Sequence, residues 1–170
     1  MPAILIAFGG LPGTGKTTIA RRLAQRIPAA YLRIDVIEQA LRDAGLTAIG
    51  PAGYGVANAL AVSNLALGQS VVADGVNPVA ESRAAWRATA ARAGAALLEV
   101  EIVCTDAEEH RRRVEGRVAD IPGHAPPDWD SVTRHHYETW PEPHLILDTA
   151  RLDPDAATAL IASHLPGGRA

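Results

Sequence analysis

The stretch GGLPGTGKTTIARRLA, residues 9–24, decides the fold class of this chain. Within it, residues 10–17 satisfy the pattern G-x-x-x-x-G-K-[S/T], with the apolar run ILIAF (4–8) before it and an amphipathic segment after it. Glycines let successive backbone N–H groups converge on an anion, and the helix that follows adds the positive end of its dipole. The stretch therefore predicts a loop, between a buried strand and a helix, that holds the phosphates of a nucleotide.

The side chains of this loop have distinct uses in phosphate binding. Lys16 is a mobile positive charge that reaches the outer phosphates, and the Thr17 hydroxyl is an oxygen ligand of the kind that Mg²⁺ prefers. A glycine-rich turn followed by a surface lysine is the less favoured explanation, because motif and context agree. The predicted nucleotide-binding residues are Gly10, Leu11, Pro12, Gly13, Thr14, Gly15, Lys16, Thr17 and Thr18.

The rest of the chain alternates short apolar runs with helical patterns. The predicted further strands are residues 29–34, 70–75, 97–104 and 145–149, and the predicted helices are 16–26, 36–45, 54–67, 79–92, 106–118, 130–139 and 155–165. Strands separated by helices predict an α/β fold, with a mainly parallel sheet covered on both faces. At 170 residues, the chain 1–170 is expected to form one domain.

Composition narrows the function classes. The formal net charge of −3 provides no long-range attraction to nucleic acid or to an anionic membrane. The N-terminal apolar run is too short for a signal core or a membrane span. Cys104 is the only cysteine, so no internal disulfide can form. We therefore expect a cytoplasmic protein with no membrane partner.

Two carboxylates are predicted at the carboxyl ends of strands, where parallel sheets bind their ligands. Asp74 ends the run VVAD and is typical of a Walker B aspartate that holds Mg²⁺ or positions substrate, although a turn before Gly75 explains it equally. Asp35 ends the second strand and is predicted to face the phosphate loop, as the base that takes the proton of an attacking hydroxyl. The alternative for Asp35 is a cap on a helix that begins at Val36.

Four other side chains are candidates for the site. Arg113 and Arg117 lie four residues apart, so they are expected on one helix face, from which they would swing over a bound nucleotide. Asn77 and Arg83 are candidate substrate contacts, with a turn residue and a surface arginine as the alternatives. The adjacent His135 and His136 point in different directions on a helix, and we expect no histidine metal site.

Five segments in this order, GGLPGTGKTT, RIDV, LALGQSVVADGVNPVAESR, VCTDAEEHRRRVEGR and LILDTA, resemble the small P-loop kinases over about residues 3–165. The nearest group contains chloramphenicol phosphotransferase, zeta toxins and polynucleotide 5′-hydroxyl kinases. The resemblance implies a five-stranded parallel sheet in the order 2-3-1-4-5, a flexible lid at about residues 118–130, ATP with Mg²⁺, and a hydroxyl acceptor. It also implies that Asp35 is the base, that Arg113 and Arg117 are lid arginines, and that residues 151–154 approach the adenine.

The chain departs from this group at one position. Members often carry an arginine about three residues after the base, where this sequence has Glu38. An acidic residue there disfavours an anionic acceptor and favours a cationic one, unless Arg42, one turn further on, restores a positive contact. A small-molecule kinase is the favoured function. A polynucleotide or nucleoside 5′-hydroxyl kinase, a non-catalytic NTP-dependent switch and a toxin are the alternatives.

Overall fold

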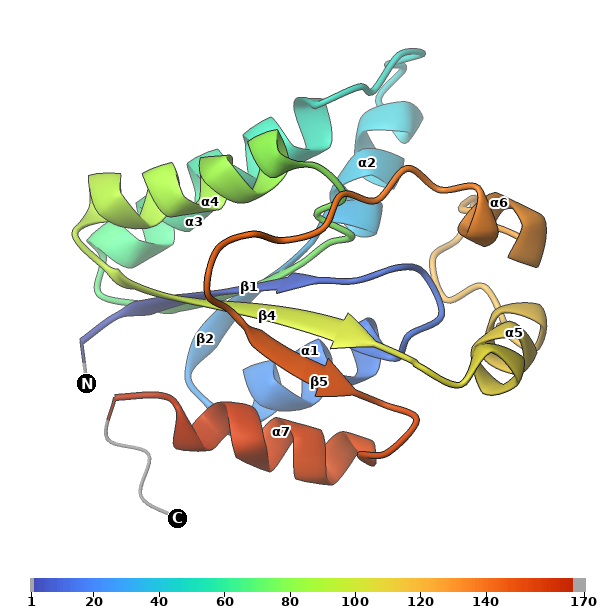
Figure 1. Ribbon diagram of the computed structural model, residues 1–170. Coiled ribbons are helices and arrows are strands. Elements are labelled where there is room, and N and C mark those ends of the chain that lie inside the picture. The colour runs from blue at the N-terminus through green and yellow to red at the C-terminus, as the bar shows by residue number, and fades with distance from the viewer. Residues whose placement is uncertain (1, 167–170) are drawn as a thin grey trace.

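The structure is a computed structural model that describes residues 2–166. Five parallel strands form one sheet in the order β2-β3-β1-β4-β5, which confirms the predicted order (Figure 1). The strands are β1 Ile4–Gly9, β2 Ala29–Arg33, β3 Ser70–Asp74, β4 Ala96–Val103 and β5 Leu145–Asp148. The helices are α1 Lys16–Arg26, α2 Ile34–Asp43, α3 Ala52–Ala66, α4 Ala80–Ala93, α5 Ala107–Glu115, α6 Trp129–Thr133 and α7 Pro154–Ser163.

Helices cover the sheet on both faces, and β1 shows why. Its side chains alternate between two apolar clusters, with Ile6 and Phe8 on the face of α1 and α7, and Leu5 and Ala7 on the face of α3 and α4. All four side chains are at most 1% exposed. A strand buried on both faces needs a continuous apolar sequence, which is what the run at residues 4–8 provides.

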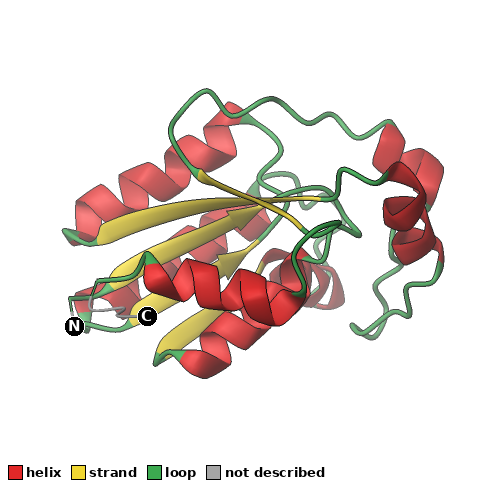
Figure 2. Ribbon diagram, turned by 60° about the horizontal axis from the view of Figure 1, so that its bottom comes forward, coloured by secondary structure: helices red, strands yellow, loops and turns green. Residues whose placement is uncertain are grey.

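The helices α5 and α6 lie beyond the carboxyl ends of the strands, apart from the helices that cover the sheet (Figures 1 and 2). The helix predicted at residues 106–118 ends earlier, at Glu115, where Gly116 is the C-cap. Glycine is a poor helix former, so the chain leaves the helix there. Arg117 consequently lies outside α5, in the segment between α5 and α6 that includes most of the residues predicted as a lid, about 118–130.

The second strand ends sooner than expected. It closes at Arg33, and α2 begins at Ile34, so Asp35 lies in the first turn of that helix. Within residues 2–166, no helix combines the length and the apolar character needed to cross a bilayer.

Candidate active site

Three glycines of the loop between β1 and α1 have positive φ, namely Gly10, Gly13 and Gly15. Gly10 has φ 132°, and a side chain there would meet the carbonyl oxygen of Ile102. Gly13 has φ 84°, and a side chain there would meet Val114 of α5. No side chain caps the N-terminus of α1, so its first amides face outward without an intrahelical acceptor. The loop therefore presents the N-terminus of a helix to an anion.

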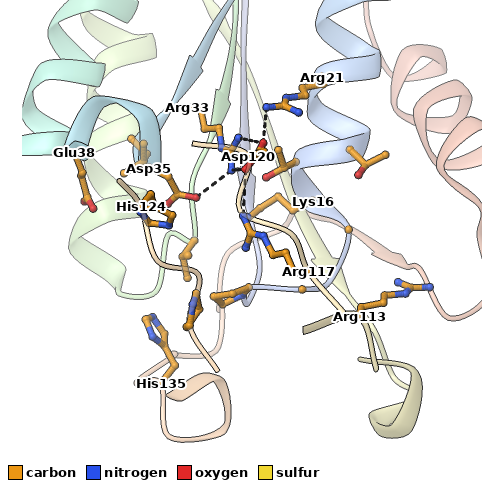
Figure 3. A pocket seen from close by; sticks show the side chains of 18 of the residues that line it. Lys16, Arg21, Arg33, Asp35, Glu38, Arg113, Arg117, Asp120, His124 and His135 are labelled. Atoms are coloured by element: carbon orange, nitrogen blue, oxygen red, sulfur yellow. Dashed lines mark hydrogen bonds and ion pairs between the residues drawn. The ribbon is translucent and has the colours of Figure 1, made fainter. Parts of the chain in front are cut away.

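A cavity of about 670 Å³ opens in front of this loop (Figure 3). Its walls come from the loop and α1, from the start of α2, and from the lid. Of the nine predicted nucleotide-binding residues, Gly10, Leu11 and Thr14 do not line it, and Thr14 bonds within the loop, to the carbonyl of Leu11 at 2.9 Å. The other six line the cavity: Pro12, Gly13, Gly15, Lys16, Thr17 and Thr18.

Lys16 and Asp74 form a buried ion pair beneath the cavity. Lys16 Nζ lies 3.5 Å from Asp74 Oδ1, and the Tyr31 hydroxyl donates to Asp74 Oδ2 at 2.7 Å. Burial, and then the neighbouring Asp74, raise the pKa of Tyr31 above its usual value, so this hydroxyl keeps its proton. Tyr31 was not predicted, because its partner is 43 residues away.

Asp74 and Thr17 are the side chains that fit a Mg²⁺ ion. Asp74 Oδ1 is buried and accepts no hydrogen bond, although Lys16 Nζ lies 3.5 Å away, and such a carboxylate oxygen is a suitable ligand for Mg²⁺ or for a water bound to it. Thr17 lines the cavity next to Lys16. Within residues 2–166, no three His, Cys, Asp or Glu side chains are grouped so that they could hold a metal. The ion would therefore depend on these two residues and on nucleotide phosphates.

Asp35 lines the same cavity as Lys16 and Thr17 (Figure 3). Its side chain is 32% exposed, and Oδ2 lies 3.6 Å from Arg33 Nη2. The alternative role as a helix cap is wrong, because Arg33 is the N-cap of α2 and no side chain caps that helix. The Asp35 carboxylate is therefore partly accessible from the cavity.

The two lid arginines have different surroundings. Arg113 lies on α5, where it donates to the hydroxyl of Thr149 at 2.8 Å, to the Thr149 carbonyl at 3.0 Å, and to Glu109 at 2.7 Å. Arg117 follows the end of α5, so the predicted common helix face does not exist. Both side chains nevertheless line the main cavity, although they point in different directions (Figure 3).

Asn77 and Arg83 do not line the cavity, and their predicted substrate contacts are not present. Asn77 is 1% exposed, donates to the carbonyl of Phe8 at 2.6 Å and accepts from Trp86 Nε1 at 2.9 Å. Arg83 is also 1% exposed and donates to the carbonyls of Asn77, Glu138 and Thr139. Both residues are buried in the scaffold outside the cavity, and their hydrogen bonds are to protein groups.

Sequence reasoning missed a cluster of charged residues at the far side of the cavity. Asp120, in the lid, accepts hydrogen bonds from Arg33 at 2.6 and 3.0 Å and from Arg21 at 2.7 Å. Arg117 Nη2 lies 4.0 Å from the same carboxylate (Figure 3). The hydrogen bonds from Arg33, opposed in part by desolvation, lower the pKa of Asp120 well below its usual value. No local motif links Arg33 to a residue 87 positions later.

Glu38 also lines the cavity, and its charge is paired. Its Oε2 lies 3.5 Å from Arg42 Nη2, one helical turn further along α2. Burial raises the pKa of Glu38, while Arg42 opposes that shift. Glu38 therefore brings little free negative charge to the cavity.

A second cavity, of about 490 Å³, adjoins the phosphate loop. Gly15, Thr18 and Arg113 line both cavities, and residues 149–154 complete the second one. Residues 151–154, the segment expected to approach the adenine, thus line a cavity together with Gly15 of the phosphate loop.

The fold is a P-loop nucleotide-binding fold of the kinase type, as the phosphate loop and the strand order β2-β3-β1-β4-β5 together indicate. A family model described as an AAA domain matches residues 5–131, and the chain belongs to this family. An uncharacterized protein of Mycobacterium tuberculosis (strain ATCC 25618 / H37Rv) is 34% identical over 115 residues, which cover 59% of this chain and 23% of that protein. The chain thus spans about a quarter of the length of the curated relatives it matches.

Solved structures with a bound nucleotide or nucleotide analogue share this fold. The APS kinase CysC of Mycobacterium tuberculosis, in complex with AMPPNP and APS, superposes with a TM-score of 0.70 at 22% identity, over 95% of this chain and 97% of that chain. Kti12 of Chaetomium thermophilum, in complex with ADP-AlF3, superposes with a TM-score of 0.66 at 21% identity, over 92% and 94%. At these identities the likeness establishes the fold alone.

Proposed function

We propose that this protein is an ATP- and Mg²⁺-dependent phosphotransferase that moves the γ-phosphoryl group to a hydroxyl of a small molecule. One observation carries the proposal. The partly exposed carboxylate of Asp35 lines the same cavity as Lys16 and the N-terminus of α1, so a base and a phosphate cradle share one space of about 670 Å³.

The reaction uses these residues in separate roles. The phosphate loop and Lys16 bind the β- and γ-phosphates, which leaves the γ-phosphorus facing the cavity. Asp35 accepts the proton of the acceptor hydroxyl as its oxygen attacks that phosphorus. The bond from the γ-phosphorus to the bridging oxygen breaks, so ADP leaves with the electron pair and the acceptor becomes a phosphate ester. The negative charge that spreads over the transferred group faces Arg117.

Thr17 and Asp74 would hold a Mg²⁺ ion, which would neutralise phosphate charge. Arg113 would bridge the two parts of the nucleotide, because it lines both cavities and is anchored to Thr149. The base would lie in the second cavity, between the phosphate loop and residues 149–154. ATP is favoured over GTP by the family resemblance, and this segment carries no N-K-x-D guanine signature.

The comparisons support the kinase class without naming the acceptor. APS kinase is described with a nucleotide analogue and a small-molecule substrate in the same fold. Kti12, which is described with ADP-AlF3, shares the fold without being named a kinase, so a nucleotide-dependent switch is the principal competitor.

An ATP-consumption screen tests the proposal. ADP release is measured with sugars, hydroxy acids, amines, antibiotics, nucleosides and 5′-hydroxyl oligonucleotides, with Lys16→Ala as the inactive reference. A small acceptor should raise ADP release well above the rate with water alone, and mass spectrometry should detect its phosphate ester. Stimulation only by oligonucleotides, falling steeply with added salt, would favour the 5′-kinase instead. ATP binding without transfer to any acceptor class would favour the switch.

A further inference from the structure

Three arginines from different parts of the fold converge on the Asp120 carboxylate. Arg33 is the last residue of β2, Arg21 lies on α1, and Arg117 follows α5. Arg33 holds the carboxylate with two hydrogen bonds, at 2.6 and 3.0 Å, and Arg21 adds a third at 2.7 Å. Such a fork of donors fits any planar carboxylate, and it also fits a phosphate.

Arg33 and Arg21 belong to the scaffold, whereas Asp120 belongs to the lid. The Arg33 side chain is only 2% exposed, and its Nε is buried without a hydrogen-bond partner. A buried guanidinium needs an anion beside it, because a buried charge without a partner is strongly destabilising. The Asp120 side chain, by contrast, is 36% exposed. Arg33 is therefore built into the core, whereas the carboxylate that it binds comes from the more exposed segment between α5 and α6.

The cluster borders the acceptor side of the cavity. Arg21, Arg33, Asp35, Arg117 and Asp120 all line it. Arg33 Nη2 is 3.6 Å from Asp35 and 3.0 Å from Asp120, so one guanidinium group contacts both carboxylates. An anion in place of Asp120 would therefore lie next to the proposed base, within reach of a small acceptor whose hydroxyl points at Asp35.

The charges around this position favour an anion. Glu38, the one acidic residue that argued for a cationic acceptor, is paired with Arg42 at 3.5 Å. If Asp120 withdraws, Arg21, Arg33 and Arg117 face Asp35 alone among the charged groups of this cluster. The three positive charges of these arginines then exceed the single negative charge of Asp35, which favours binding of a further anion.

We propose that Asp120 occupies an anion subsite for the acceptor. An acceptor that bears a carboxylate or phosphate ester close to its hydroxyl displaces Asp120, and the arginines then bind the anionic group of the acceptor. The inference rests on the proposed kinase function and names the substrate class. It assigns recognition of the acceptor's anionic group to Arg33 and Arg21. Asp120 then acts as a competitor that occupies the subsite until an acceptor arrives.

Amide chemical-shift titrations test this subsite without turnover. The protein is first saturated with AMPPNP and Mg²⁺, so that the phosphate loop is filled, and is then titrated with inorganic phosphate and, separately, with glycolate. Asp120→Asn should tighten binding of at least one anion fivefold or more, with shifts at residues near Arg33. A stronger response to phosphate indicates a phosphate-ester acceptor, and a stronger response to glycolate indicates a hydroxy acid.

Arginine variants supply the second arm. In the Asp120→Asn background, Arg21→Gln should weaken anion binding threefold or more, and since Arg21 is half exposed the fold should tolerate this change. Arg22→Gln is the matched control, because Arg22 is the next residue on α1 and pairs with Asp155 outside the cavity. Unchanged anion affinity in Asp120→Asn, or equal losses for the two arginine variants, would overturn the inference. Failure to bind AMPPNP at all would refute the kinase proposal itself, and the subsite with it.

Discussion

Replacing Asp35 by asparagine removes the proposed base and changes little else. The substitution keeps the shape of the side chain, and no hydrogen bond of the helix cap is lost, because Asp35 does not cap α2. The ion pair with Arg33 is lost, but it is long, at 3.6 Å, and one partner is a third exposed. Arg33 also retains its two bonds to Asp120. Such a pair stabilises the fold by about 1 kcal/mol at most.

The catalytic loss should be much larger than this structural cost. A positioned base contributes about 10²–10⁴ in rate, which corresponds to about 2.7–5.4 kcal/mol of transition-state free energy. We therefore expect kcat for the acceptor found in the screen to fall by about 10²–10⁴, with the affinity for ATP within about threefold of the wild type. The free energy of unfolding should fall by no more than about 2 kcal/mol, once the favourable position of Asp35 in the first turn of α2 is included.

Three measurements separate these effects. A coupled assay of ADP release gives kcat, titration with a fluorescent ATP analogue gives nucleotide affinity, and chemical denaturation gives the free energy of unfolding. Asp43→Asn is the matched control, since it makes the same change on the same helix outside both cavities. A kcat within threefold of the wild type would refute the role of Asp35 as base. Equal losses of kcat and ATP affinity would show that Asp35 acts on the nucleotide instead.

Three further changes test other parts of the reasoning. Gly13→Ala should weaken ATP binding at least tenfold and lower the unfolding temperature, because φ is 84° and the new methyl group meets Val114; wild-type ATP affinity would contradict this. Asn77→Ala should cost about 2–4 kcal/mol in denaturant unfolding, because buried partners lose their hydrogen bonds, yet leave the Michaelis constant of the folded enzyme unchanged; a raised constant would restore Asn77 as a substrate contact. The depressed pKa of Asp120 means that its bonds to Arg33 stabilise the fold above the ordinary pKa of 3.8 and that this contribution is lost as the pH falls below that value. Wild type should therefore lose more stability than Asp120→Asn between pH 5 and about pH 2, and parallel stability curves would contradict the assignment.

The phosphate loop could be predicted because its signals are local, whereas the sheet order came from the family resemblance. The loop motif lies within eight consecutive residues, and the apolar run before it is long enough to require burial on both faces. The helix after it follows from its own apolar stripe, in which Ile19 and Leu23 are fully buried. The ends of helices were predicted less well than their positions. The helix α5 ends at Glu115, three residues before its predicted end, because Gly116 is a poor helix former.

Predictions failed for residues whose role depends on what the fold packs against them. Asn77 follows a strand carboxyl end, as a ligand-binding residue would, but its left-handed backbone, with φ 51°, turns its amide toward the core instead of the cavity. Arg83 has the spacing of a surface helix residue, yet the chain from Glu138 to Trp140 covers it. The sequence alone does not reveal these long-range contacts, so it does not distinguish Asn77 and Arg83 from ligand-binding residues.

The two halves of the cavity differ in how far the sequence reveals them. The nucleotide half is built from consecutive residues that bind a constant ligand, so its residue types follow from phosphate chemistry alone. The acceptor half is assembled from Arg21, Arg33 and Asp120, whose contacts span 87 to 99 positions. These contacts exist only when the lid meets the scaffold, so the features that select an acceptor depend on tertiary structure. Substrate specificity in this chain is therefore expected to change with the lid and the end of β2, while the phosphate loop remains the same.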